Sequence, residues 1–364
     1  SLAGCAGQGS SNNNEDSPTQ TPSGGVQTTN KTTKNLTTIK TAFAPLGITN
    51  LIVSMAEDEG ILQEKMKNAG YKLDIKRTWS EKPLFASGKI DLSLTLGAVE
   101  GARIGPKTNE KMTVNGYVLP QFGASQVKKG GPFDPENTGS KQATIDKIVN
   151  ENAKYAIGSW SGGHVPPDRM IIKDQFDYQF TPDGDFNVVT ASYTAIPKLL
   201  VDGKIAIGGV SPPLGGAPYI RKDQVTPIFG TPSGLKKLGL SPFSLALGNC
   251  LARKSFTDKH APAVKALLEA WQESAAMFHN NPKEWATKNE EYTKMIGATS
   301  AEQAEFIAQW CKQYTLFGID LTMVPKDPLL TDDYIQNDKR AMKTMRKFGV
   351  VPENWNNFLS YNKL

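Results

Sequence analysis

The stretch Phe85-Ala86-Ser87-Gly88-Lys89-Ile90-Asp91-Leu92 decides the fold, because a short helix through Leu84 and Phe85 gives way within it to a strand. Residues 89–96 alternate between aliphatic and polar side chains, which is typical of a strand with one buried face. A short helix that leads directly into such a strand predicts one unit of an α/β sheet.

The sequence before this stretch supplies the rest of the sheet. Residues 38–44 predict a first strand, a helix is expected over residues 50–67 with Gly70 as its stop, and residues 73–79 predict a second strand. Repeated strand–helix–strand units give parallel strands with right-handed connections. Residues 114–121 predict a strand that leaves this sheet.

A second strand–helix alternation follows, and the last third of the chain is helical. Its predicted elements are strands over 155–158, 187–190 and 204–208, with helices over 144–150, from near Pro167 and over 195–202. The helical spacing of six apolar residues predicts a core stripe made of Val264, Leu267, Leu268, Trp271, Ala275 and Phe278. Residues 123–142, rich in Gly, Pro and Lys, predict an exposed loop, and Ser300 with Gln303 predicts a helix cap.

Composition excludes several classes of protein. The 364 residues carry a net charge of only +5, and their basic residues are scattered, so we expect no nucleic-acid partner. No apolar run reaches the length of about 18–20 residues that a membrane-spanning helix needs. Three cysteines are too few and too widely spaced for a zinc site or an iron–sulfur cluster. Cys250 and Cys311 either form one disulfide or are two buried thiols.

The N-terminus resembles that of a lipoprotein. Leu2-Ala3-Gly4-Cys5 is similar to a lipobox, in which the cysteine thiol carries a diacylglyceryl anchor. The residues that follow are almost all polar or small and cannot bury enough apolar area to offset the entropy of ordering. We therefore expect residues 1–37 to be a lipobox remnant and a disordered tether, with Cys5 as the lipidation site and the protein on the outer face of the cell membrane.

Four motifs together resemble the solute-binding proteins of ABC importers for nitrate, sulfonates, taurine and thiamine-pyrimidine precursors. The motifs are Glu57-Asp58-Glu59-Gly60-Ile61-Leu62, residues 85–92, their repeat over residues 197–206, and the segment from Pro262 to Asn281-Pro282-Lys283-Glu284. In the repeat, Ala206 stands where that family usually has Asp. The resemblance covers about residues 38–290.

This resemblance implies an α/β fold of the type II periplasmic binding protein class. Each of two lobes would hold a mainly parallel sheet flanked by helices, with the C-terminal helices completing lobe one. Lobe one would comprise residues 38–120 plus 245–364, and lobe two residues 121–244. A small-molecule ligand would bind between the lobes, which close by a hinge motion. The resemblance also implies an ABC transporter permease as partner, and we expect a monomer.

Ligands of open α/β sheets bind beyond the carboxyl ends of the strands, where helix N-termini present free N–H groups. The loops there include residues 44–50, 96–101, 159–164 and 210–216. The strongest candidate is Ser159-Trp160-Ser161-Gly162-Gly163-His164, whose glycines and hydroxyls suit an oxyanion. The expected ligand-binding residues are Thr49, Trp79, Ala98, Glu100, Ser159, Trp160, Ser161, Gly162, Ser192 and Ser211.

Three of these residues keep a structural alternative, and the first, Trp79, either stacks on a ligand or belongs to the core. Thr49 is either a ligand donor or a helix cap, and Glu100 is either a ligand partner or a capping charge. His164 could contact a ligand but is expected to be simply exposed.

The sequence contains no recognisable catalytic motif. The three histidines, His164, His260 and His279, lack a recognisable nucleophile partner, and no phosphate-binding or dinucleotide motif occurs. We expect no enzyme, no cofactor and no metal. The favoured ligand is a sulfonate, a nitrate-like ion or another small oxyanion. Two alternatives remain open: a flat heterocycle stacked on Trp79, Trp160 and Phe43, and a ligand-sensing surface protein without a transporter.

Overall fold

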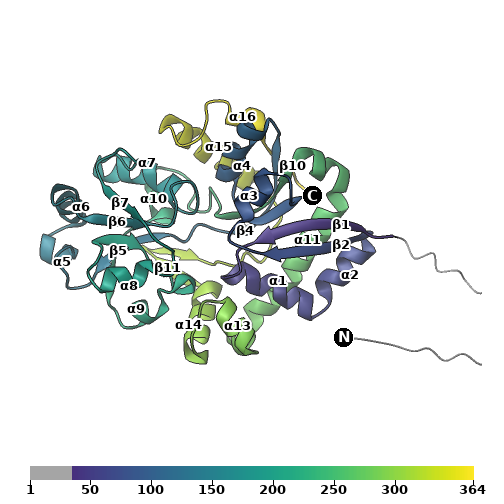
Figure 1. Cartoon of the computed structure of the whole chain (residues 1–364), viewed down its shortest axis with the longest axis horizontal. Coiled ribbons are helices and arrows are strands. Elements are labelled where there is room, and N and C mark those ends of the chain that lie inside the picture. The colour runs from purple at the N-terminus through teal and green to yellow at the C-terminus, as the bar shows by residue number, and fades with distance from the viewer. Residues whose placement is uncertain (1–34) are drawn as a thin grey trace, which may run out of the picture. The chain divides into compact units, whose positions relative to one another are not determined.

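The structure is a computed structural model that describes residues 35–364. The expected lipidation site Cys5 and most of the expected tether lie outside these residues. Within them, two large sheets are flanked by helices and a third sheet has only two strands, so the expected α/β class is confirmed (Figure 1). No helix of the described part is both long and apolar enough to cross a membrane.

The first sheet has six strands in the order β13-β4-β10-β3-β1-β2. Its strands are β1 (Thr37–Phe43), β2 (Tyr71–Arg77), β3 (Leu92–Leu96), β4 (Met112–Leu119), β10 (Gly248–Arg253) and β13 (Leu359–Tyr361). Strand β1 pairs in parallel with both β2 and β3, which confirms the expected parallel unit, whereas β10 pairs antiparallel to β3 and β4. The helices in the same part of the chain are α1 (Ile48–Asp58), α2 (Ile61–Asn68), α3 (Glu81–Ala86), α4 (Ala98–Thr108), α11 (Lys254–Asn280), α15 (Asp332–Lys347) and α16 (Trp355–Phe358).

The second sheet has five strands in the order β7-β6-β8-β5-β9. Its strands are β5 (Ala124–Lys128), β6 (Lys154–Ile157), β7 (Asn187–Thr190), β8 (Ile207–Gly209) and β9 (Val225–Gly230). Its helical segments are α5 (Pro135–Thr138), α6 (Lys141–Asn150), α7 (Val165–Phe176), α8 (Ile196–Val201), the 3₁₀ turn η1 (Pro212–Leu214), α9 (Ala217–Arg221) and α10 (Thr231–Lys237). Every strand of this sheet therefore lies between the crossing at residues 120–123 and the return to β10, and we keep residues 121–244 as the proposed second lobe.

Two predictions of local structure are wrong. Residues 123–142 are not an exposed loop, because β5 pairs with both β8 and β9 and its Val127 is fully buried. A short central strand that is covered on both faces shows no alternation of apolar and polar residues. The helix expected over residues 50–67 is two helices, because Gly60 adopts a φ of 73° and breaks it.

The C-terminal elements pack against helices that flank both large sheets. They comprise α12 (Pro282–Thr287), α13 (Glu290–Met295), α14 (Ala301–Lys312), β11 (Tyr314–Leu316) and β12 (Ile319–Leu321). Helix α14 contacts α12 as well as α9 and η1, and Lys141 of α6 lies 4.2 Å above the Phe317 ring. The Ser300 cap is confirmed, since its Oγ accepts a hydrogen bond from the amide of Gln303.

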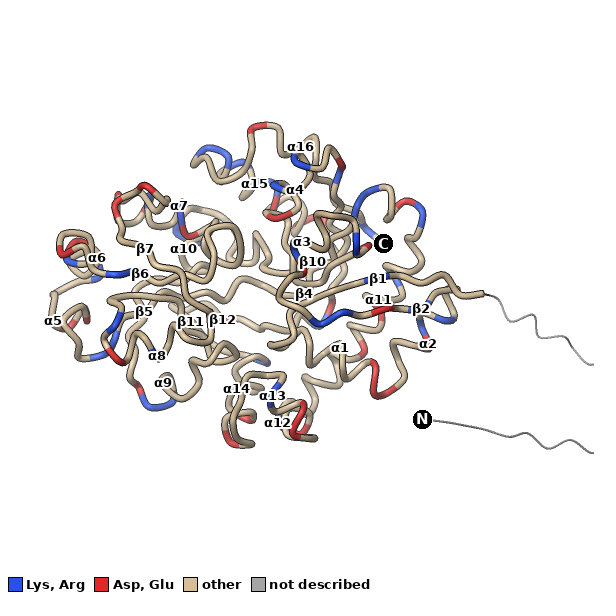
Figure 2. Tube along the Cα trace, viewed as in Figure 1, with Lys and Arg blue, Asp and Glu red and all other residues tan. Residues whose placement is uncertain are grey.

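The predicted core stripe on α11 is also confirmed, because all six of its residues are buried. Cys250 and Cys311 are buried free thiols, so the disulfide alternative is wrong and the thiol alternative is confirmed. Figure 2 shows that acidic and basic residues are scattered over the described part of the chain and that neither sign forms a continuous stripe.

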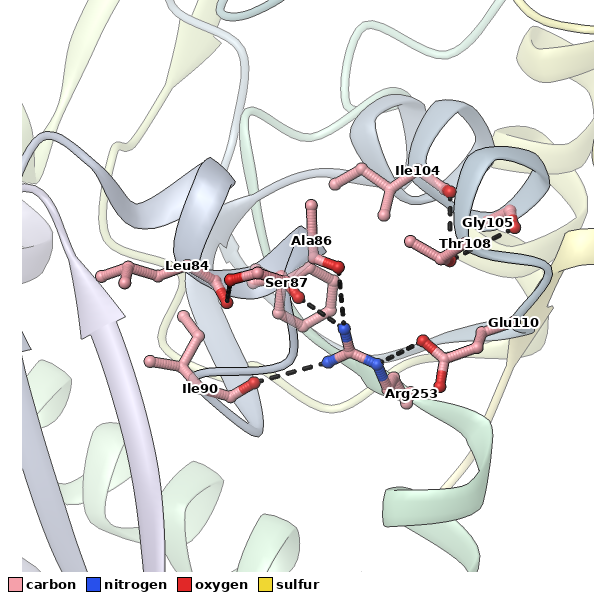
Figure 3. Close-up of polar contacts among 10 residues, drawn as sticks. Leu84, Ala86, Ser87, Ile90, Ile104, Gly105, Thr108, Glu110 and Arg253 are labelled. Atoms are coloured by element: carbon pink, nitrogen blue, oxygen red, sulfur yellow. Dashed lines mark hydrogen bonds and ion pairs between the residues drawn. The ribbon is translucent and has the colours of Figure 1, made fainter.

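Arg253, at the end of β10, anchors helix α3 to the first sheet (Figure 3). Its Nη2 donates to the carbonyl oxygens of Phe85 and Ala86 at 2.5 and 3.4 Å, and its Nη1 donates to that of Ile90 at 3.4 Å. Its Nε donates to a Glu110 carboxylate oxygen at 2.6 Å. The Phe85 carbonyl also accepts from the amide of Gly88, so the guanidinium adds a charged donor to the backbone bonds that end this short helix.

We predict that Arg253→Met lowers the free energy of unfolding by about 2–4 kcal/mol, because it leaves these carbonyl groups and Glu110 without their charged partner. Urea denaturation measures the change. The control is Lys254→Met, which removes an exposed ion pair to Asp258 and should change stability by less than about 1 kcal/mol. Equal effects of the two substitutions would contradict the anchoring role.

Candidate functional site

A cavity of about 300 Å³ lies between the two sheets, at the carboxyl ends of their strands. The first sheet and the segments packed on it contribute Ala44, Leu46, Gly47, Ile48, Thr49, Trp79, Glu81, Lys82, Thr95, Leu96, Glu100, Leu119, Leu247 and Met323. The second sheet contributes Ala124, Ser159, Ser161, Gly162, Gly163, His164, Tyr193, Gly209, Val210, Ser211, Pro213 and Leu214. The crossing segment adds Gln121, Phe122 and Gly123.

Seven of the ten expected ligand-binding residues line this one cavity. They are Thr49, Trp79, Glu100, Ser159, Ser161, Gly162 and Ser211. They come from loops far apart in the sequence, which meet because each follows a strand at the facing edges of the sheets. The cavity therefore lies where ligands of open α/β sheets bind, beyond the carboxyl ends of the strands.

Three of the expected residues do not line the cavity. Ala98 is fully buried, and its amide donates to Asn249 Oδ1 at 3.0 Å. Trp160 packs on Phe180, with ring centroids 5.3 Å apart. Ser192 is exposed to solvent. Phe43, considered as a stacking residue, is fully buried in the core of the first sheet.

Thr49 has a free hydroxyl at the cavity wall. Helix α1 begins at Ile48 after Gly47, whose φ of 109° favours glycine, and no side chain caps this helix. Thr49 Oγ1 is buried and has no hydrogen-bond partner among the described residues. A buried hydroxyl without a partner costs free energy, so a ligand that bonds to Thr49 gains from supplying one.

Glu100 is a capping residue that also faces the cavity. Its Oε2 accepts a hydrogen bond from the amide of Gly97 at 3.1 Å, which confirms the capping alternative. Burial raises the pKa of Glu100, and the nearby Lys82 charge opposes this shift. The side chain is 7% exposed, so its carboxyl group meets the cavity rather than bulk solvent.

Glu81, the first residue of α3, was not predicted from the sequence. The hydroxyl groups of Ser93 and Thr95 on β3 donate to its two carboxylate oxygens. Burial raises the pKa of Glu81 to about 7, although these hydrogen bonds oppose the shift. Ser93 and Thr95 are two residues apart and share one face of β3, so their spacing is the sequence signal that could have indicated a buried polar partner.

Lys82 links the two sheets across the cavity. Its Nζ donates to the carbonyl oxygen of Ser161 at 2.9 Å, and Arg103 Nη1 donates to the same oxygen at 3.4 Å. Burial lowers the pKa of Lys82, and the Glu100 carboxylate opposes this shift. The loop after β6 is therefore held by cations of α3 and α4.

His164 and Tyr193 form the wall on the side of the second sheet. His164 is mostly buried rather than exposed, and burial lowers its pKa to about 4, so the imidazole is neutral near pH 7. Burial raises the pKa of Tyr193 to about 12, and its hydroxyl has no partner among the described residues. Glycine at position 158 makes room for the Tyr193 ring, because a Cβ there would lie 2.1 Å from it.

Metal chemistry has no obvious site in residues 35–364, where no three His, Cys, Asp or Glu side chains gather as ligands. The polar side chains of the cavity include two buried carboxyl groups, one ammonium, a neutral imidazole and several hydroxyl groups. Three of their oxygens, Thr49 Oγ1, Gln121 Oε1 and the Tyr193 hydroxyl, have no hydrogen-bond partner among the described residues. This set can bind and orient a small molecule by hydrogen bonds between apolar walls.

Comparison with solved structures identifies the fold. No protein-family model and no curated protein sequence matches this chain. The alkanesulfonate-binding protein SsuA from Xanthomonas axonopodis, bound to MOPS, aligns with a TM-score of 0.62 at 9% identity, over 89% of this chain and 98% of its own. The chain has the periplasmic binding protein fold.

Other solved proteins with this fold are also named as binding proteins. The periplasmic nitrate-binding protein NrtA from Synechocystis aligns with a TM-score of 0.61 at 14% identity, over 89% of this chain and 86% of its own. The ligand-binding component of an ABC-type import system from Staphylococcus aureus, with zinc bound, aligns with a TM-score of 0.57 at 14% identity. The alignment covers 89% of this chain and 97% of its own. The resemblance inferred from the sequence motifs is confirmed at the level of the fold.

We predict that Glu81 makes this periplasmic binding protein fold less stable as pH rises. Its pKa is about 7 when folded and near 4.5 when unfolded, so the unfolded chain ionises first and stability falls progressively between these values. Urea denaturation at about pH 5 and about pH 8 should show a loss in the wild type that exceeds the loss in Glu81→Gln by up to about 3 kcal/mol. The same pH dependence in both proteins would contradict the shifted pKa.

Proposed function

We propose that this protein is an extracytoplasmic solute-binding protein, anchored through Cys5, that delivers a small ligand to the permease of an ABC importer. The observation that carries the proposal is the single cavity assembled from seven expected residues on two facing sheets. The comparison with sulfonate- and nitrate-binding proteins of the same fold supports it. The protein would act as a binder and not as an enzyme.

The composition of the cavity favours a flat and largely apolar ligand. Most of its side chains are apolar, among them Ile48, Leu96 and Met323, and Trp79 and Phe122 add aromatic faces. The carboxyl groups of Glu81 and Glu100 would repel an anion whenever they are ionised. We therefore rank a flat heterocycle above the oxyanion that the Gly-rich loop alone had favoured.

A thermal-shift screen of the full chain against pyrimidines, thiamine precursors, riboflavin, taurine, sulfonates, nitrate and bicarbonate tests this proposal. A ligand at 100 times its dissociation constant adds about 2.7 kcal/mol to stability, which is readily detected. The proposal predicts a shift with at least one flat heterocycle and none with bicarbonate. A shift with none of these compounds would argue against solute binding at this cavity.

We predict that Trp79→Ala weakens binding of such a heterocycle by about ten-fold, because the exposed indole lies at the cavity and offers a stacking face. Isothermal titration calorimetry measures the change. Phe348→Ala is the matched control, since Phe348 is also a partly exposed aromatic residue but lies away from the cavity. If wild type and Trp79→Ala bound the heterocycle with equal affinity, Trp79 would have no stacking role.

A small oxyanion is the second candidate, and Lys82 is the observation that favours it. Lys82 lines the same cavity as the free Thr49 hydroxyl and the N-terminus of α1, and all three groups attract an anion. For this candidate we predict that Lys82→Met weakens binding of methanesulfonate or nitrate by about ten-fold to one hundred-fold. Lys107→Met, an exposed cation on α4, is the control. Unchanged affinity in Lys82→Met would exclude this candidate.

A further inference from the structure

Gln121 joins the two segments that connect the sheets. It lies in the first crossing, between β4 and β5, and its Nε2 donates to the carbonyl oxygen of Leu245 at 2.8 Å in the return crossing. This bond fixes the orientation of the amide, because a carbonyl accepts only from the nitrogen. The amide oxygen of Gln121 must therefore point the other way.

The oxygen of Gln121 is buried and has no donor. The side chain is 2% exposed and lines the cavity, and Oε1 has no hydrogen-bond partner among the described residues. Almost all buried polar groups in proteins are paired. An unpaired acceptor on a cavity wall is thus a position at which a bound molecule would supply an N–H or O–H group.

Leu245, the acceptor of the Gln121 bond, is itself constrained. It is a fully buried residue with a φ of 57°, a conformation that side chains other than glycine rarely adopt. Its amide donates to Asp338 Oδ1 at 2.6 Å, and Asp338 also accepts from the hydroxyl of Tyr361 at 2.6 Å. Strained connecting residues of this kind take up the backbone changes of hinge motion.

We propose that Gln121 selects ligands that donate a hydrogen bond and couples their binding to the return crossing at Leu245. This inference rests on the proposed function. A donor placed on Oε1 polarises the amide and strengthens its Nε2 bond to Leu245, since chained hydrogen bonds reinforce one another. Ligands that only accept hydrogen bonds, such as nitrate or a donor-free sulfonate, leave Oε1 unpaired. Their negatively charged oxygens are repelled by the partial negative charge of Oε1.

Matched pairs of probes test the selectivity by isothermal titration calorimetry on the full chain. The pairs are uracil with 1,3-dimethyluracil, and taurine with ethanesulfonate, in which the second member has lost its N–H donors. We expect the donor-bearing member to bind at least about ten-fold more tightly in a pair that binds. Equal or tighter binding of the donor-free member in every pair that binds would overturn the proposal.

Three variants separate the two roles of Gln121. Gln121→Leu should abolish the discrimination within a pair. Gln121→Glu keeps an acceptor oxygen but loses the donor to Leu245, so it should retain discrimination and increase hydrogen exchange over residues 240–250. The matched control is Gln126→Leu, because Gln126 makes a bond of the same kind to Val210, also at 2.8 Å, and does not line the cavity. Gln126→Leu should change neither the discrimination within a pair nor the hydrogen exchange. If Gln126→Leu lost the discrimination as much as Gln121→Leu, the selective role of Gln121 would be overturned.

Failure of the proposed function is recognised separately. If neither pair binds to the wild type, solute binding of this kind is rejected, and hydrogen exchange of the free protein decides the coupling alone. Faster exchange over residues 240–250 in Gln121→Glu, with no change in Gln126→Leu, would support the link between the crossings. Unchanged exchange in Gln121→Glu would overturn it.

Discussion

Helix α3 is held at both ends by buried polar groups, and the cavity depends on this arrangement. At its C-terminal end, Arg253 bonds the carbonyl groups of Phe85 and Ala86. At its N-terminal end, the Glu81 carboxylate accepts from Ser93 and Thr95. A helix of six residues is too short to be stable alone. These anchors therefore fix where the side chain of Lys82 enters the space between the sheets.

The same anchors determine the electrostatics of the cavity. Glu81 and Glu100 are buried on the first sheet, where low polarity favours their neutral forms, and His164 is held neutral on the second. Lys82 and Arg103 both reach from the first sheet to the second, through the Ser161 carbonyl. Burial thus reduces the ionisation of both carboxyl groups relative to exposed ones. Neutral hydrogen-bonding groups such as Thr49, Gln121 and Tyr193 then carry more weight in choosing a ligand.

Local periodicity and chain order were enough to predict the parallel strands β1, β2 and β3 and the loops that line the cavity. They were not enough for β5, because a short strand covered on both faces lacks alternation. Ala98 and Trp160 lie in segments that were expected to line the site, but Ala98 begins α4 and its amide bonds Asn249, and the Trp160 ring packs on Phe180. Glu81 and Gln121 were missed because their importance comes from partners distant in sequence, and one sequence does not reveal such pairings.

The two crossings between the sheets contribute unequally to the proposed hinge. The first crossing supplies Gln121 and Phe122 to the cavity wall, and the return crossing supplies Leu247 together with the strained backbone of Leu245. A ligand in the cavity therefore meets both connections at once. Because the Gln121 side chain forms a hydrogen bond between them, we expect a change at its oxygen to be transmitted to Leu245, whose backbone has a positive φ. In this fold, recognition and closure would then depend on one side-chain amide rather than on separate parts of the molecule.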